Sequence, residues 1–269
     1  SVTGVQTCAL PISRKSFVVA MKDIPEIWEI SYNPKAEPIY DGLVHDYRMG
    51  EGVAKPGYLN VRRTILDEPL DDFFFDQSYR HVLGATRPKA SGHGTAQVVN
   101  LDIRKKIADL PIAGMPHLGS GITWKWEGTT VLASPNLKGN AIDVIDMQNW
   151  RLLKSIPVPG PGFFMRSHEN TPYAWTDSMM SQSAKDTLTI IDKSTLTPVA
   201  SVKEPGKTLA HIEFTKDGRY ALASVWEMDG ALIVYDAKTF QEIKRLPMSK
   251  PVGKYNVWNK ITRSEGTSH

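Results

Sequence analysis

The sequence predicts an all-β fold made of four-stranded blades, a partial version of a β-propeller. Three observations support this prediction. A short β-rich run that ends in Asp recurs along the chain, a polar turn and a second β-rich run follow each copy, and Asp-Gly turns separate further β-rich segments. A repeat of about 45 residues made of strands and tight turns is typical of propeller blades. Helical periodicity is weak throughout.

The repeated runs end in four aspartates that lie 44, 46 and 44 positions apart. The runs are residues 97–102, 141–146, 187–192 and 231–236, and they end in Asp102, Asp146, Asp192 and Asp236. The partner strands that follow them are residues 106–110, 152–156, 198–202 and 242–246. An Asp at a strand end can accept hydrogen bonds from the backbone of the next turn. We therefore expect one shared structural role for the four aspartates.

Two further segments extend this pattern towards the N-terminus. Residues 17–20 and 26–30 are expected to be the inner and middle strands of an earlier blade, and Asp217-Gly218 is expected to close a turn between two strands. The units add up to five or six blades. We interpret the chain as a propeller without its early blades, and a complete small propeller is the alternative.

The first residues differ in character from the rest of the chain. Residues 1–13 resemble the translation of a sequencing-library adapter, so we expect them to be non-native and to lie outside the blade pattern. The alternative is a genuine apolar arm. The native domain would then be residues 14–269, and a signal peptide is not expected in a chain that has lost its natural start.

Composition excludes several classes of function. The chain has 32 Lys and Arg against 29 Asp and Glu, with the two signs interspersed, which is unlike the basic stripe of a nucleic-acid binder. No apolar run is long enough to span a bilayer. Cys8 is the single cysteine, so residues 14–269 contain no disulfide, no thiolate metal site and no attachment motif for a c-type haem.

The candidate site residues lie where chain segments enter the inner strands. His117 and His211 occupy the same register of two repeats, and a third segment in that register carries Arg166 and His168. Neutral imidazole is the usual nitrogen ligand of haem iron, and Arg suits the carboxylates of a porphyrin. Tyr255, in a segment expected to close the ring, has a phenol that could pass a proton. Alternatively, these histidines satisfy backbone groups beside turns.

Several phrases resemble the haem d1-binding propeller of the cytochrome cd1 group. They are residues 17–19, 115–117, 121–124, 164–169 and 253–257, and the resemblance extends from Phe17 to His269. It implies an eight-bladed propeller, of which this chain would be a part, and a bound haem d1 or dihydro-haem d1 with its iron. Haem c is implied only for an N-terminal cytochrome c domain outside this sequence.

Two positions separate the branches of this group. Phe75 stands where the nitrite reductases of the group carry a second distal histidine, and His211 stands where they have none. The chain is therefore more similar to the periplasmic branch that oxidises a propionate side chain of dihydro-haem d1 to an acrylate during haem d1 biosynthesis for denitrification.

That branch implies a role for each candidate residue. His211 would be the axial iron ligand or essential catalytic histidine, His117 a second pocket histidine and Tyr255 a supporting group, with Arg166 and His168 also contacting the macrocycle. The expected partners are the haem d1 precursor, nitrite reductase and other haem d1 biosynthesis proteins. A nitrite reductase domain, a non-catalytic haem d1 assembly protein and a generic propeller interaction module remain alternatives.

Overall fold

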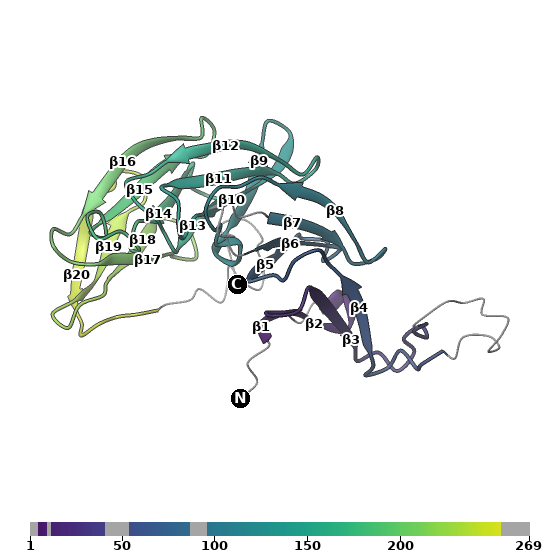
Figure 1. Ribbon diagram of the computed structural model, residues 1–269. Helices are drawn as coiled ribbons and strands as arrows, with labels where there is room; N and C mark the ends of the chain where they lie inside the picture. The colour runs from purple at the N-terminus through teal and green to yellow at the C-terminus, as the bar shows by residue number, and fades with distance from the viewer. Residues whose placement is uncertain (1–4, 10–11, 41–53, 87–95, 254–269) are drawn as a thin grey trace. The chain divides into compact units, whose positions relative to one another are not determined.

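The computed structural model describes residues 5–9, 12–40, 54–86 and 96–253. These residues form five four-stranded antiparallel sheets, and the strands of each sheet are adjacent in the order in which they occur along the chain (Figure 1). Two 3-10 turns are described, η1 (Ile12–Arg14) and η2 (Leu118–Ser120). The predicted all-β class of four-stranded sheets is confirmed. The chain divides into two compact units, residues 1–86 with 97–108 and residues 87–96 with 109–269.

The first unit contains the first sheet and most of the second. The strands are β1 (Val5–Ala9), β2 (Ser16–Met21), β3 (Glu26–Ser31) and β4 (Val61–Ile65), then β5 (Asp72–Phe75), β6 (His81–Ala85), β7 (Ala96–Asn100) and β8 (Lys105–Leu110). Alternate residues of these strands share a buried apolar cluster that includes Val18, Ile27, Leu70, Phe73 and Val82. Successive side chains of a strand point to opposite faces, so one face of each sheet supplies this core.

The position of the N-terminal residues differs from the prediction. β1 pairs antiparallel with β2, with Ala9 opposite Val18, so the expectation that residues 1–13 lie outside the blade pattern is wrong for Val5–Ala9. The exposed edge of β2 offers unpaired N–H and C=O groups to any β-rich neighbour, whatever its origin. β2 and β3 are therefore the second and third strands of their sheet. The adapter origin of the segment stays a prediction.

The second unit contains the remaining three sheets. Their strands are β9 (Ile122–Trp126), β10 (Thr129–Pro135), β11 (Ala141–Asp146) and β12 (Arg151–Pro157); β13 (Met165–Ser167), β14 (Tyr173–Asp177), β15 (Thr187–Asp192) and β16 (Thr197–Lys203); and β17 (Leu209–Phe214), β18 (Tyr220–Val225), β19 (Ala231–Asp236) and β20 (Glu242–Pro247). The runs predicted at residues 141–146, 187–192 and 231–236 match β11, β15 and β19.

Apolar clusters join these three sheets in sequence order. Val131 and Val144 of the third sheet pack with Met165 and Ile191 of the fourth. Trp175 of the fourth sheet belongs to a second cluster with residues of the fifth, among them Leu209, Phe214, Ile233 and Tyr235. Burying these faces provides most of the driving force for association of the sheets. The inner strands β13 and β17 are thereby held beside each other.

The strand-end turns confirm three of the four predicted aspartate roles. Oδ1 of Asp146, Asp192 and Asp236 each accepts two hydrogen bonds from backbone N–H groups of the following turn, over 2.8 to 3.1 Å. Asp102 is the exception. In its sheet Asn100 Oδ1 accepts the two turn N–H groups, and Asp102 instead forms ion pairs with Arg14 and Arg80.

The same four turns share a second feature, which explains the exception. The fourth residue after each capping Asn or Asp has a left-handed backbone, with φ of 51° to 63°; these residues are Arg104, Trp150, Leu196 and Phe240. This spacing places Asn100, not Asp102, in the repeat. An Asn side-chain oxygen accepts the same hydrogen bonds as a carboxylate oxygen. A repeat defined by Asp alone therefore predicts Asp102 where the turn is capped by Asn100.

Candidate haem-binding site

His117 lies in the segment between β8 and β9, and its imidazole has a defined orientation. Its backbone N–H donates to the Pro135 carbonyl oxygen at 2.8 Å, and its ring Nδ1 donates to the Phe163 carbonyl oxygen at 2.7 Å. Because a carbonyl oxygen can only accept, Nδ1 carries the proton of the neutral ring and Nε2 carries the lone pair. The half-buried imidazole thus has the tautomer of a base or a metal ligand at Nε2.

Two phenylalanines connect His117 with His211. The His117 ring packs on Phe163 with 4.2 Å between centroids, Phe163 packs on Phe164 at 4.7 Å, and Phe164 meets the His211 ring edge-on at 4.4 Å. Trp226 packs edge-on against Phe164 with 6.1 Å between ring centroids. We call His117, Phe163, Phe164, His211 and Trp226 the imidazole-aromatic cluster. Both predicted histidines belong to it.

His211 lies inside β17 at an irregularity of the strand. The pairing of β17 with β18 shifts between Ala210 and Glu213, and His211 has a φ of 53° at this bulge. A left-handed backbone is unfavourable for a residue with a side chain, and such strain is often found at functional sites. The imidazole is 1% exposed. His117 precedes its strand whereas His211 lies within one, so the two registers are similar but not identical.

Asp177, which sequence reasoning missed, is buried at the centre of this region. Its Oδ1 accepts hydrogen bonds from the N–H groups of Phe163 at 2.8 Å and Met179 at 3.4 Å, and its Oδ2 from those of Phe164 at 3.2 Å and His211 at 3.5 Å. Burial raises the pKa of this carboxyl to about 6, although the four N–H donors act in the opposite direction.

Asp177 occupies a position that carries a polar residue in two other sheets as well. Asn136 follows β10 and accepts from Met115 N–H, and Glu227 follows β18 and accepts from Thr208 N–H. A polar residue at the end of the second strand thus recurs. The spacings in the sequence are 41 and 50, because the connecting loops differ in length, so a search for one constant period overlooks it.

Arg166 and Glu213 form a buried pair between β13 and β17. Arg166 is 2% exposed, its Nε lies 3.6 Å from Glu213 Oε2, and its Nη1 donates to the Met165 carbonyl oxygen at 2.8 Å. Glu213 also accepts from the Phe214 N–H at 2.9 Å. A buried charge is expensive without a partner, so this pairing accounts for the burial of both side chains. Contact of Arg166 with a porphyrin carboxylate stays a prediction.

His168 follows β13 and contacts the β17–β18 turn, and contact of its ring with a macrocycle stays a prediction. Its Nδ1 accepts from the Asn170 N–H at 3.0 Å and its Nε2 donates to the Lys216 carbonyl oxygen at 3.1 Å, so backbone groups engage both ring nitrogens. A Cβ built on Gly218 would lie 2.4 Å from His168 Nδ1, which shows how closely the ring packs on the β17–β18 turn. His168 therefore joins two sheets.

Two further predicted positions are described by themselves. Phe75 packs against Phe73 and Tyr79 at centroid distances of 5.6 and 5.4 Å. This position therefore presents an aromatic ring and no proton donor. Tyr255 lies outside the described residues.

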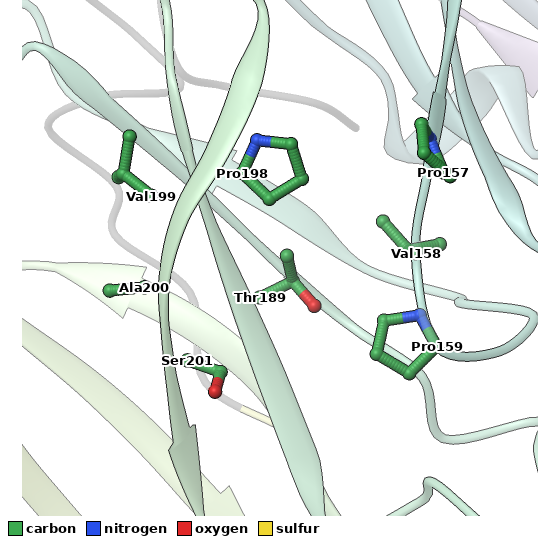
Figure 2. A pocket seen from close by; sticks show the side chains of 8 residues that line it. All are labelled: Pro157, Val158, Pro159, Thr189, Pro198, Val199, Ala200 and Ser201. Atoms are coloured by element: carbon green, nitrogen blue, oxygen red, sulfur yellow. The ribbon is translucent and has the colours of Figure 1, made fainter.

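A cleft separate from the cluster lies between the third and fourth sheets (Figure 2). It has a volume of about 460 Å³ and a mainly apolar lining from the end of β12, the segment after it, β15 and β16; the lining residues are Pro157, Val158, Pro159, Thr189, Pro198, Val199, Ala200 and Ser201. Its only side-chain polar groups are the hydroxyls of Thr189 and Ser201. It therefore carries no titratable group and no metal ligand of the usual kinds.

Within the described residues, no three His, Cys, Asp or Glu side chains are grouped as a metal site. That part of the chain also contains no helix with the length and apolar character needed to cross a membrane. Any metal chemistry at the imidazole-aromatic cluster would therefore depend on one or two imidazoles together with a ligand that brings its own metal coordination, as a haem does.

Comparison with known proteins identifies the family of this chain. Residues 55–260 match the family described as the cytochrome D1 heme domain. The chain belongs to this family. Members of the cytochrome D1 heme domain family that resemble it include the dihydro-heme d1 dehydrogenase of Pseudomonas aeruginosa, which is 48% identical over 257 residues, 95% of this chain and 47% of the relative.

Two solved structures are similar in fold to this family member. The structure of dihydro-heme d1 dehydrogenase NirN in complex with DHE has a TM-score of 0.77 and 47% identity, and the match covers 92% of this chain and 48% of that one. Kuenenia stuttgartiensis hydrazine synthase has a TM-score of 0.60 at 14% identity, covering 91% and 66%, which indicates a shared fold alone. The chain thus spans about half the length of the dehydrogenases that it matches.

Proposed function

We propose that this chain is the haem d1-binding domain of a periplasmic dihydro-haem d1 dehydrogenase, and that its five sheets are blades of a partial propeller derived from an eight-bladed ring. The reaction is the oxidation of a propionate side chain of dihydro-haem d1 to an acrylate, the step that completes haem d1. The main support is the 48% identity to a dehydrogenase of this name over nearly the whole chain.

The imidazole-aromatic cluster suits a flat macrocycle with a central iron. Aromatic rings can stack on a macrocycle, and an imidazole that donates from Nδ1 to a carbonyl oxygen presents Nε2 as a ligand or base. His211 would ligate iron or take a proton. Since His211 is 1% exposed and its ring packs against Phe164, this role requires Phe164 to move away from it when substrate binds.

The reaction removes one hydrogen from each of two adjacent carbon atoms, so two protons and two electrons leave the substrate. His117 Nε2 would accept one proton, and His211 or Tyr255 would accept the other. Arg166 would bind a porphyrin carboxylate once its pairing with Glu213 is exchanged. We expect the electrons to pass to haem c in a cytochrome c domain outside this sequence.

Anaerobic single-turnover spectroscopy with dihydro-haem d1 tests this function in a protein that carries its electron-accepting domain. His211→Ala should abolish conversion, whereas His117→Ala and Tyr255→Phe should slow it and leave binding largely intact. His81→Gln is the control, because His81 forms a structural pair with Asp76 at 2.8 Å. Wild-type conversion by His211→Ala would remove His211 from the mechanism.

The alternatives give different results in the same assay. A nitrite reductase would reduce nitrite with bound haem d1, which Phe75 disfavours because a phenyl ring donates no proton. A non-catalytic assembly protein would bind the macrocycle without converting it. Proposed partners are the haem d1 precursor, nitrite reductase and other proteins of haem d1 biosynthesis.

A further inference from the structure

We propose that Asp177 is a positioning residue, whose buried carboxylate holds both histidines of the imidazole-aromatic cluster in one fixed arrangement. The positioning role rests on geometry alone. Its consequence for catalysis rests on the proposed function. Asp177 acts through the backbone: its carboxylate accepts from the N–H of His211, and from the N–H of Phe163, whose carbonyl oxygen supports His117.

The carboxylate of Asp177 binds two separate segments. Oδ1 accepts from Phe163 N–H and Oδ2 from Phe164 and His211 N–H, so Asp177 in β14 joins the segment before β13 to the bulge of β17 in the next sheet. The short bond to Phe163, at 2.8 Å, is the strongest of these by distance. The single side chain therefore connects two sheets through their backbones.

Each histidine depends on one of these connections. The Phe163 carbonyl oxygen accepts from His117 Nδ1, so a displacement of Phe163 changes the support of that imidazole. His211 has a left-handed backbone at a bulge, a conformation that persists only where its surroundings stabilise it. The N–H of His211 lies 3.5 Å from Asp177 Oδ2, at the point where the strain occurs.

The corresponding residues of the neighbouring sheets do not make this connection. The side chains of Asn136 and Glu227 bind backbone N–H groups at the start of their own sheets, whereas Asp177 binds N–H groups of two sheets. A carboxylate is also the chemical group that the geometry requires. All four of its partners are N–H donors, two at each carboxylate oxygen. Only a group with two acceptor oxygens can accept from both sets of donors.

Asp177→Asn is the decisive variant. An amide has one oxygen and one NH₂ group, so one orientation places a donor against Phe163 N–H and the other places a donor against Phe164 and His211 N–H. Either orientation breaks the link to one histidine. Asp192→Asn is the matched control: it makes the same chemical change in the same sheet, Asp192 Oδ1 accepts both turn N–H groups, and Asn100 performs that role naturally.

The measurements are the ring resonances of His117 and His211 in histidine-labelled protein, and single-turnover conversion of dihydro-haem d1. We expect Asp177→Asn to shift or broaden at least one of the two sets of resonances and to slow conversion at least 10-fold, with Asp192→Asn unchanged in both. Wild-type resonances in Asp177→Asn would overturn the positioning role. If wild-type protein does not convert the substrate, the proposed function fails, and the resonances still decide the inference.

Amide hydrogen exchange of the wild-type protein provides a measurement that does not depend on folding of the variant. The N–H groups of Phe163, Phe164 and His211 should exchange together and slowly, because one buried carboxylate protects all three, although Phe163 and Phe164 precede β13. Fast exchange at Phe163 and Phe164 beside slow exchange in β13 would overturn the proposal.

Discussion

Replacing His211 by glycine should give a more stable protein than replacing it by alanine, which reverses the usual order of these residues in a strand. Both variants remove the imidazole and its contact with Phe164 at 4.4 Å, so these losses cancel in the comparison. What differs is the cost of the backbone conformation, because His211 has a φ of 53°.

The magnitude follows from two opposing terms. A residue with a Cβ loses roughly 1 to 2 kcal/mol in the left-handed region, and glycine does not. Glycine loses about 0.5 to 1 kcal/mol more than alanine on folding, because its unfolded chain has more freedom. The balance favours His211→Gly over His211→Ala by about 1 kcal/mol.

Urea unfolding of the two variants measures this difference. Ala210→Gly is the control, since Ala210 is the buried neighbour of His211 in β17 and does not have a positive φ. The free energy of unfolding of Ala210→Gly should be lower than that of the wild type by about 0.5 to 1 kcal/mol. If His211→Ala is as stable as His211→Gly or more so, the bulge relaxes without the histidine and the reasoning on strain is refuted.

Three other predictions concern Asp177, Gly218 and Asp192. The pKa of Asp177 is raised from 3.8 to about 6 in the folded protein, so its contribution to stability is fully present below the unfolded-state value of 3.8 and is lost as the pH rises from there through 6; the difference in unfolding free energy between wild type and Asp177→Asn should therefore fall by about 3 kcal/mol between pH 3 and pH 7 in urea titrations, and a flat difference would contradict the burial argument. Gly218→Ala should lose at least about 2 kcal/mol, because the new Cβ meets the His168 ring at 2.4 Å and the φ of 72° is unfavourable; thermal unfolding close to that of wild type would show that the ring moves at little cost. Asp192→Ala should lose about 1 kcal/mol while Asp192→Asn stays near wild type, and equal losses would mean that charge matters more than the hydrogen bonds.

The repeat and most of the strands could be predicted from the sequence because they depend on local patterns. β11 and β19 begin and end at the predicted residues, since alternation of apolar residues and a capping Asp are both short-range signals. Asp102 was assigned wrongly for the same reason: the pattern contains no information on which of Asn100 and Asp102 faces the turn. Pairing of β1 with β2 depends on an available strand edge, which composition does not indicate.

The candidate site could be predicted only in part. His117 and His211 were selected because they recur near the first strands of two repeats, and because imidazole is the usual nitrogen ligand of haem iron. His168 contacts Lys216, which lies 48 residues later in the sequence, and Asp177 contacts His211, which lies 34 residues later. Both contacts join two sheets, and no local sequence pattern describes them. The left-handed backbone of His211 was not foreseen either, because the bulge arises from the pairing of β17 with β18.

The polar position after the second strand shows how a repeated architecture can acquire a specialised centre without changing its backbone. Asn136, Asp177 and Glu227 occupy similar places and bind the start of their own sheets, yet they are an amide, a buried carboxylate and a longer carboxylate. Divergence among copies is tolerated here because each residue retains the one hydrogen bond that the repeat needs. The spare bonding capacity of the side chain is then open to selection, and in Asp177 it binds the backbone of the neighbouring sheet.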